Sequence, residues 1–423
     1  MTMVKWIGRF IGTAIILSLL ATMDSTIMYA DDNTAASESA SPQSLLEQSI
    51  KSVKLADPTG KLNPASYQMQ FVKDSKEFPA IDSIFPDRSG EHIIIVYDLH
   101  DYVYKNGEFT NNTIKVASIQ AKDGKKVWDT VIGKKQFSQS IYSVQSNGEI
   151  FLTTEDKSHF YLHTIDEKTG KITRTISQPH PSKPTFLAWD YWLVDNNQLL
   201  VSYEVNNQST LRYFDAAGKL LRTRTVPGIV RSAQADRILV TNGDVFRYTL
   251  SVQDAKGNTI FKKSIADQGF FWNAYLLPDQ SVAVESQIDG KAKQKDRFQL
   301  IKYNARGEKQ WQHTIWDEYS PYLPNGNQMM AFLRVQKKVI FLNDQGKAIH
   351  PMFGSEDGWM DLRNKEVYFT GNITRIADAK TMKWLTELEY EGDKPQVAWL
   401  GKQQLAIYDG KNDVIAVIRI KGK

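Results

Sequence analysis

The pattern of apolar residues along the chain changes at about Tyr67. From there to the C-terminus, short runs rich in Val, Ile, Tyr, Phe and Thr alternate with turns rich in Asn, Asp and Gly, and no helical period persists. Examples are His92–Leu99, Glu149–Thr154, Gln198–Tyr203, Val282–Ser286 and Glu366–Thr370. Because no stretch has the strand–helix–strand pattern of a parallel sheet, we predict an all-β domain over residues 66–423.

A turn that contains Asx, Gly or Lys recurs just before a strand. Its copies are Arg88–Gly90, Ser146–Gly148, Asp195–Asn197, Ala235–Arg237, Pro278–Gln280, Asn325–Asn327, Arg363–Lys365 and Gly401–Gln403. Their centres are separated by 58, 49, 40, 43, 47, 38 and 38 residues, spacings typical of four-stranded propeller blades. The repeat therefore predicts an eight-bladed β-propeller of four-stranded antiparallel blades.

A second signal follows these turns in most repeats. It is a Gly, often beside an acidic or amide residue and a Lys, with a bulky residue four positions later. The pairs are Gly124/Trp128, Gly170/Arg174, Gly218/Arg222, Gly257/Phe261, Gly307/Trp311 and Gly346/His350. The Gly supplies the positive φ of a tight hairpin, and we expect the bulky residue to pack between neighbouring blades. In the last two repeats the signal decays to Asp378–Trp384 and Asp409–Asp413.

These segments resemble the quinoprotein-like (PQQ-like) propeller repeat. Ser118–Trp128, with the sequence SIQAKDGKKVW, is similar to its A-x-D-x-x-T-G-x-x-x-W docking motif. Thr164–Lys171 is similar to the first half of that motif, with Arg174 in the place of the Trp. The resemblance covers roughly Ile81 to Lys423 and implies the same propeller fold.

The resemblance implies two functional classes. Enzymatic members hold a quinone cofactor over a Trp floor, a calcium ion, an Asp base and a disulfide of adjacent cysteines; non-enzymatic members include an envelope propeller of outer-membrane protein assembly. This chain has no Cys, so it cannot form that disulfide, and it also lacks the lipid-modified Cys of the assembly propeller. We expect the non-enzymatic class and no cofactor, and keep PQQ and calcium for the enzymatic alternative.

The last repeat is one strand short. It offers Val397–Leu400, Gln404–Tyr408 and Val414–Ile420 before the sequence given stops at Lys423. The spare strand is Tyr67–Val72. We predict that it completes the last blade, because closing the ring protects both sheet edges.

The N-terminus has the order of a secretory signal peptide. Lys5 and Arg9 precede an apolar run from Phe10 to Met23, which is short for a bilayer span. We expect residues 1–30 to be a signal peptide and the protein to be extracytoplasmic, either secreted or associated with the cell envelope. An uncleaved N-terminal membrane anchor is the alternative.

The composition of residues 31–65 predicts a disordered tether that contains a short helix. The stretch to Gln43 is rich in Ser, Ala and acidic residues and has little apolar surface to bury. Ser44 and Glu47 fit a capping box, and Leu46, Ile50 and Val53 fall on one helical face.

Neither the charge nor the histidines indicate nucleic-acid binding or metal binding. A formal charge of +4 without a basic run gives no case for nucleic-acid binding. His159 and His163 would lie about 13 Å apart on a strand, too far to share a metal, and we expect them at the surface. The carboxylate pairs at 317–318 and 356–357 are expected to be solvated loop charges. No catalytic or metal-ligating set stands out.

Aromatic residues are the most specific candidates for a binding site. Predicted blade starts carry Trp189, Trp272, Trp359 and Trp399, with further aromatic residues at Trp192, Phe271, Tyr319 and Tyr322. Connectors that enter first strands form one rim of a propeller, so the four Trp are expected near one opening, partly exposed, where they would stack on a ligand or partner. Packing between blades is the alternative. The polar insert Asp289–Arg297 is a second candidate, as a basic finger for an anionic polymer.

We therefore expect an exported, non-enzymatic binding or scaffold protein of the cell envelope, whose propeller rim holds a protein or polymer partner of unknown identity. The alternative is a quinone- or sugar-dependent enzyme on the same ring, either a PQQ-type dehydrogenase or a glycan-active protein.

Overall fold

The computed structural model describes residues 41–422, apart from short gaps. The gaps are 101–103, 106–107, 110–111, 135–136, 145–147, 157, 180–188, 195–197, 267–268, 289–296, 317–321, 326–327, 334–337, 354–358, 364–365, 371–372 and 392–393. The predicted signal peptide, the first part of the tether, the carboxylate pairs at 317–318 and 356–357 and the body of the basic insert lie outside the described residues. The rest forms two compact units, described separately below: unit 1 contains Pro181–Phe353, and unit 2 contains Ala30–His180 and Gly354–Lys423.

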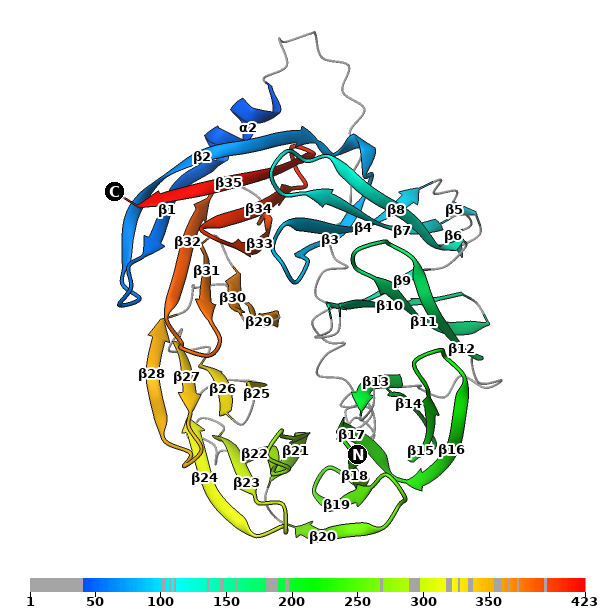
Figure 1. Cartoon of the computed structure of the whole chain (residues 1–423). Helices are drawn as coiled ribbons and strands as arrows, with labels where there is room; N and C mark the ends of the chain where they lie inside the picture. The colour runs from blue at the N-terminus through cyan, green and yellow to red at the C-terminus, as the bar shows by residue number, and fades with distance from the viewer. Residues whose placement is uncertain are drawn as a thin grey trace. The chain divides into compact units, whose positions relative to one another are not determined.

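Unit 1 is built from antiparallel sheets of four consecutive strands (Figure 1). The first two are β13 (Trp189–Val194), β14 (Gln198–Val205), β15 (Gln208–Phe214), β16 (Leu220–Pro227), and β17 (Ile229–Gln234), β18 (Arg237–Gly243), β19 (Arg247–Asp254), β20 (Thr259–Ala266). The next two are β21 (Phe270–Leu276), β22 (Val282–Ile288), β23 (Arg297–Tyr303), β24 (Lys309–Trp316), and β25 (Tyr322–Asn325), β26 (Gln328–Leu333), β27 (Lys338–Leu342), β28 (Ala348–Phe353). Such meanders are the blades of β-propellers.

Unit 2 repeats this plan. One sheet contains β3 (Ile81–Pro86), β4 (His92–His100), β7 (Asn112–Gln120) and β8 (Lys126–Lys134), with a side hairpin of β5 (Tyr104–Lys105) and β6 (Glu108–Phe109); a second contains β9 (Phe137–Val144), β10 (Glu149–Glu155), β11 (His159–Asp166) and β12 (Ile172–Pro179). The remaining strands are β1 (Ile50–Ala56), β2 (Leu62–Asp74), β29 (Trp359–Arg363), β30 (Glu366–Thr370), β31 (Ile373–Asp378), β32 (Trp384–Tyr390), β33 (Gln396–Gly401), β34 (Gln404–Asp409) and β35 (Val414–Gly422). They form one nine-stranded sheet, and the short helix η2 (Ser75–Glu77) follows β2.

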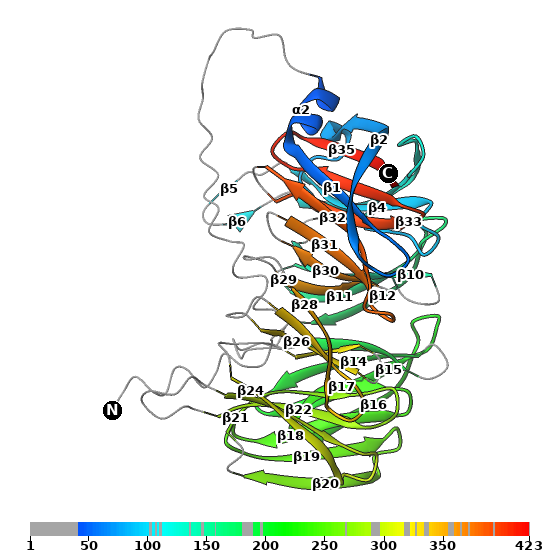
Figure 2. The same ribbon diagram turned by 90° about the vertical axis from the view of Figure 1, so that its left-hand side faces the viewer.

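The N-terminal strand β2 completes the set β33–β34–β35, and Figure 2 shows β2 beside β35. It pairs antiparallel with β35, so that Tyr67 lies opposite Ile420 and Val72 opposite Ala416. The pairing predicted for Tyr67–Val72 is therefore confirmed. Phe71 of β2 also packs against the apolar cluster beside β3 and β4, and a Cβ added to Gly124 would lie 3.0 Å from its ring.

The segment between the helix and β2 differs from the prediction. Helix α2 (Pro42–Ser49) begins three residues earlier than expected, because the hydroxyl of Ser41 caps it and Pro42 occupies its first turn. Ile50 and Val53 are not helical: they belong to β1, which pairs with both β32 and β2.

A β-bulge accounts for the misread helical spacing. The register of β1 against β32 shifts between Ile50 and Ser52, so Ile50 and Val53 both face the core although they are three residues apart. Leu46 of α2 is fully buried in the same cluster. Ordered structure in the described chain therefore begins at α2, and residues 42–65 are not a disordered tether.

The two repeated sequence signals are confirmed at the positions that the structure describes. The predicted Asx and Gly turns fall between the first and second strands of the four-stranded sets. The Gly of the second signal has positive φ, as at Gly346 (φ 71°). Its missing side chain leaves room for a bulky residue from the preceding sheet. A Cβ on Gly346 would lie 2.6 Å from the indole of Trp311, and one on Gly170 would lie 2.5 Å from that of Trp128.

One member of this series was assigned to the wrong residue. Arg222 stacks on Tyr213 of its own sheet, with its guanidinium carbon 3.9 Å from the ring centroid. The side chain that reaches the next Gly, Gly257, is Arg224, whose guanidinium also donates to the carbonyl of Asp254 at 3.4 Å. The sequence spacing places both arginines on β16 but does not say which of them reaches the neighbouring sheet.

Candidate functional site at one end of unit 1

The four predicted Trp lie on first strands of four-stranded sets. Trp189 is in β13 and Trp272 in β21, both in unit 1, whereas Trp359 is in β29 and Trp399 in β33, both in unit 2. The side chains of Trp189 and Trp359 lie outside the described residues. The expectation that all four surround one opening stays a prediction, and the site described here is built within unit 1.

Trp272 and Trp399 are both half-buried. Trp272 packs against the apolar cluster of β21–β24 and β26–β27, and its indole N–H donates to Oε1 of Gln287 at 3.0 Å. Trp399 packs against the cluster of the nine-stranded sheet, and its backbone N–H donates to the hydroxyl of Tyr368 at 2.9 Å. Each therefore contributes to packing as well as presenting part of its ring to solvent.

Trp272 belongs to a row of aromatic rings that leads from the core to the surface. We call Phe246, Phe270, Trp272 and Phe298 the aromatic row. Phe298 is 1% exposed and Phe246 is 55% exposed. The centroids of successive rings are 5.7 Å (Phe246–Phe270), 5.7 Å (Phe270–Trp272) and 6.2 Å (Trp272–Phe298) apart. The first two contacts are edge-to-face, a favourable geometry for aromatic pairs.

The hairpin that carries Phe246 is held by hydrogen bonds. The carboxylate of Asp244 accepts from the backbone N–H of Phe246 at 2.8 Å and of Arg247 at 2.7 Å, and these bonds lower the pKa of Asp244. The carbonyl of Val245 accepts from the N–H of Phe271 at 2.7 Å, which ties the hairpin to β21. Gly243 is required at φ 129°, since a Cβ there would lie 2.3 Å from the carbonyl oxygen of Arg247. Phe246 is thus presented from a defined turn.

A charged cluster of Asp190, Glu204 and Arg231 lies at the same end of these sheets. Asp190 is near the start of β13, Glu204 near the end of β14 and Arg231 near the start of β17. In an antiparallel meander these three positions lie at the same end of the sheets. The β18–β19 hairpin and the start of β21 also lie at that end. The guanidinium carbon of Arg231 lies 5.0 Å from the ring centroid of Phe271, the residue between Phe270 and Trp272.

Burial controls the protonation of this cluster. Loss of hydration raises the pKa of Asp190 to about 6, although the positive charge of Arg231 opposes the shift. Burial also raises the pKa of Glu204 and lowers that of Arg231. The cluster places two carboxyl groups beside one guanidinium, which also donates from Nε to Oγ1 of Thr241 at 2.9 Å.

Phe246 was missed by the sequence analysis. Aromatic residues at predicted strand starts include Phe271 and Trp272, whereas Phe246 lies in a turn between two strands. Its signal was available: the apolar pair Val245 and Phe246 follows Gly243 and Asp244 in a segment that otherwise predicts a polar hairpin. Solvent exposure of such a residue could not be inferred without knowing which rings lie beside it.

The two strand histidines do not share a ligand. Both lie on β11 with Tyr161 between them. The centroid of the Tyr161 ring lies 5.9 Å from that of His159 and 6.0 Å from that of His163. The expectation of surface histidines is wrong for His163, which is 3% exposed and bonded to Thr154 and Thr175. Burial lowers its pKa to about 4. In the described part of the chain, no group of three His, Asp or Glu residues is arranged to hold a metal.

Comparison with known proteins gives likenesses of fold. No family model matches the chain, and no curated protein matches its sequence. Similar solved structures include the Dos1 propeller (TM-score 0.48, 11% identity, 84% of this chain and 95% of that one) and the β-propeller domain of the Trilobed protease from Pyrococcus furiosus (0.43, 11%, 76% and 95%). BamB from Moraxella catarrhalis is a third (0.39, 14%, 77% and 100%).

These neighbours are β-propellers, but at such identities and TM-scores they carry no argument about function. Membership of the quinoprotein-like repeat family stays a prediction. No helix within the described residues is both long and apolar enough to cross a bilayer.

Proposed function

We propose that this chain is an exported, non-enzymatic binding protein of the cell envelope, which holds a protein partner at the aromatic row. We also propose that its four-stranded sets form an eight-bladed ring completed by β2. The N-terminal Lys5 and Arg9 before the apolar run support export. The recurring hairpins and the pairing of β2 with β35 support the ring.

The observation that carries the binding proposal is the exposure of Phe246 at the end of a packed aromatic row. An isolated exposed apolar residue needs no explanation. Phe246 differs because its hairpin is fixed by Asp244 and because Phe270 and Trp272 extend the aromatic surface beside it. Rigid aromatic side chains lose little conformational entropy on binding and are enriched among the residues that dominate protein interfaces.

The charged cluster favours a partner with a positively charged side chain at this surface. With two carboxyl groups and one guanidinium, it has a net negative charge when both Asp190 and Glu204 are ionised. A partner segment that places an apolar side chain on Phe246 and a Lys or Arg towards Asp190 and Glu204 would complement both features.

The test is affinity capture from envelope extracts with purified wild-type protein and two variants. Phe246→Ala removes the exposed ring, whereas Ile260→Ala removes an exposed side chain (38% exposed) at the other end of the same sheet. We expect Phe246→Ala to lose a partner that both the wild type and Ile260→Ala retain, with unchanged melting temperatures. Retention of the same partners by all three proteins would refute binding at the aromatic row.

The same purified protein also tests the enzymatic alternative. A dehydrogenase of the quinoprotein type would bind PQQ and calcium and reduce an artificial electron acceptor in the presence of an alcohol or sugar. A binding protein would do neither. Substrate-dependent reduction that requires both additions would replace the present proposal.

A further inference from the structure

A cavity lies between the first two sheets of unit 1, at the end opposite the aromatic row. Its volume is about 360 Å³, within the range of small-molecule sites. It is lined by Val194, Gln198, Leu200, Tyr213, Leu221, Arg222, Ala235, Asp236, Arg237, Ile238, Ala255 and Lys256. Several of these residues belong to the β17–β18 and β19–β20 turns, which lie at the other end of the sheet from the Phe246 hairpin.

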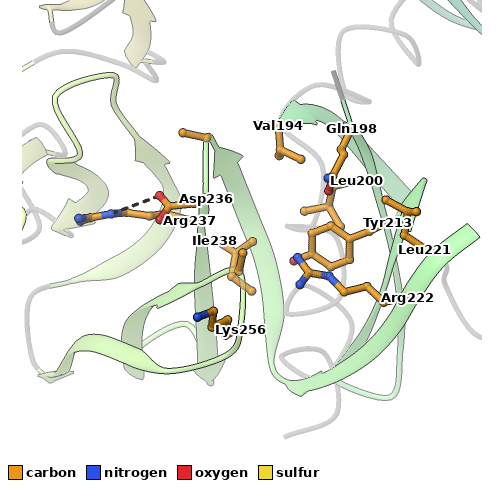
Figure 3. A pocket seen from close by; sticks show the side chains of 12 residues that line it. Val194, Gln198, Leu200, Tyr213, Leu221, Arg222, Asp236, Arg237, Ile238 and Lys256 are labelled. Atoms are coloured by element: carbon orange, nitrogen blue, oxygen red, sulfur yellow. Dashed lines mark ion pairs between the residues drawn. The ribbon is translucent and has the colours of Figure 1, made fainter. Parts of the chain in front are cut away.

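The floor of the cavity is apolar. Leu200, Tyr213 and Ile238 are buried members of one cluster that joins the two sheets, and Val194 packs against it. In Figure 3, Leu200 and Tyr213 stand on one wall and Ile238 on the facing wall. An apolar ligand body that entered here would therefore contact the existing core.

One side of the cavity is positively charged. Arg222 stacks on the Tyr213 ring at 3.9 Å, and Lys256 belongs to the facing sheet (Figure 3). Within the described chain, Asp236 is the single carboxylate in the lining, and it lies 3.9 Å from the Nε of Arg237. Since that pair balances itself, Arg222 and Lys256 leave the cavity with an excess of positive charge.

A buried hydroxyl lies beside the Arg222 guanidinium. Tyr213 is 2% exposed, and the interaction of its hydroxyl with Arg222 partly offsets the rise in pKa that burial causes. Buried polar atoms are normally paired, and a ligand oxygen would give this hydroxyl an acceptor. Burial raises the pKa of Tyr213, so the hydroxyl keeps its proton at neutral pH and remains a donor. Its position beside Arg222 gives two donors on one wall.

We propose that this cavity binds a small organic carboxylate with an apolar body. The carboxylate would accept hydrogen bonds from the Tyr213 hydroxyl and the Arg222 guanidinium, with Lys256 providing a second positive charge. The aliphatic or aromatic body would lie on Leu200 and Ile238. The site is independent of the aromatic row and of any partner that binds there.

Calorimetry and ligand-observed NMR with defined probes test this inference. The probes are phenylacetate and hexanoate as carboxylates, hexanol as the neutral analogue and inorganic phosphate as an anion without an apolar body. We expect both carboxylates to bind at a single site per chain, hexanol to bind about ten- to a hundredfold more weakly, and phosphate not to bind.

Two variants locate the binding, and one serves as a control. Arg222→Gln should weaken hexanoate binding by about ten- to a hundredfold. Leu221→Trp should block the entrance; Leu221 is 48% exposed, so the larger side chain does not have to be buried. Lys262→Gln, on exposed β20, removes a cation that does not line the cavity and should leave affinity unchanged.

Equal binding of hexanoate by the wild type, Arg222→Gln and Leu221→Trp would overturn the inference, as would the absence of binding at millimolar concentration. Phosphate binding as tight as carboxylate binding would also overturn it, because the apolar floor would then have no role. Melting temperatures confirm that each variant is folded, and Leu221→Trp keeps the test decisive if Arg222→Gln is unstable.

Discussion

The pairing of β2 with β35 can be tested with an engineered disulfide. The chain has no Cys, so a pair of introduced cysteines reports only on itself. Gln68 and Arg419 are direct Cα partners, and both side chains are exposed. Direct partners in antiparallel strands have Cα atoms about 4.5–5.5 Å apart, which suits a disulfide. Gln68→Cys with Arg419→Cys should therefore oxidise readily.

The size of the expected effect follows from the length of chain that the bond encloses. About 350 residues separate the two positions, and the entropy model of cross-linking gives a stabilisation of about 6 kcal/mol for such a loop. The assay is a non-reducing gel with peptide mass spectrometry, followed by the melting temperature with and without reductant. We expect one intramolecular product and a higher melting temperature in the oxidised form.

A displaced pair provides the control. Gln68→Cys with Lys421→Cys places the cysteines on the same exposed face but one diagonal apart, where the Cα atoms are too distant for a relaxed bond. Failure of the direct pair to oxidise, or equal oxidation of both pairs, would refute the strand register and with it the completion of the last set by an N-terminal strand.

Four further substitutions probe packing and protonation. Gly346→Ala forces a Cβ into the docked indole at positive φ, and we expect a loss of about 1–3 kcal/mol in a urea titration; no change in the midpoint would contradict the docking contact. Burial, assisted by the carboxylate of Asp82, raises the pKa of Asp98 to about 7, so the folded state binds the proton more tightly than the unfolded state and stability falls as pH rises from about 4 to 7. Asp98→Asn should therefore melt above the wild type at pH 8, by a margin that shrinks towards pH 5; a pH-independent difference would contradict the assignment. Trp272→Ala should cost about 3–5 kcal/mol, whereas Phe246→Ala should cost under about 1 kcal/mol, because Trp272 packs against the core and is hydrogen-bonded, whereas Phe246 is 55% exposed; similar losses would contradict the division between core-packed and exposed rings.

The repeated hairpins could be predicted because their chemistry is local. An Asx or Gly turn fixes the chain reversal within a few residues, and a Gly with positive φ, such as Gly170, leaves room for an indole from the preceding sheet. The pairing of β2 with β35 could also be predicted from sequence. The last repeat has only three strands, and a spare strand near the N-terminus can complete it and cover the open sheet edge.

The features that sequence did not reveal depend on contacts between distant segments. The bulge after Ile50 made β1 resemble a helix, and only its partner β32 identifies it as a strand. Arg222 and Arg224 are two residues apart on β16, and their different roles follow from the positions of Tyr213 and Gly257. The cavity exists because residues from two sheets fail to fill the space between them, a volume that no single segment encodes.

The proposal that a protein partner binds the aromatic row is tested most directly by site-specific photo-crosslinking in intact cells. A photoreactive phenylalanine analogue replaces Phe246 in one strain and Ile260, at the other end of the same sheet, in a second. We predict a discrete, light-dependent adduct from position 246 that position 260 does not give. No adduct at position 246, or the same adducts from both positions, would contradict partner binding at this surface.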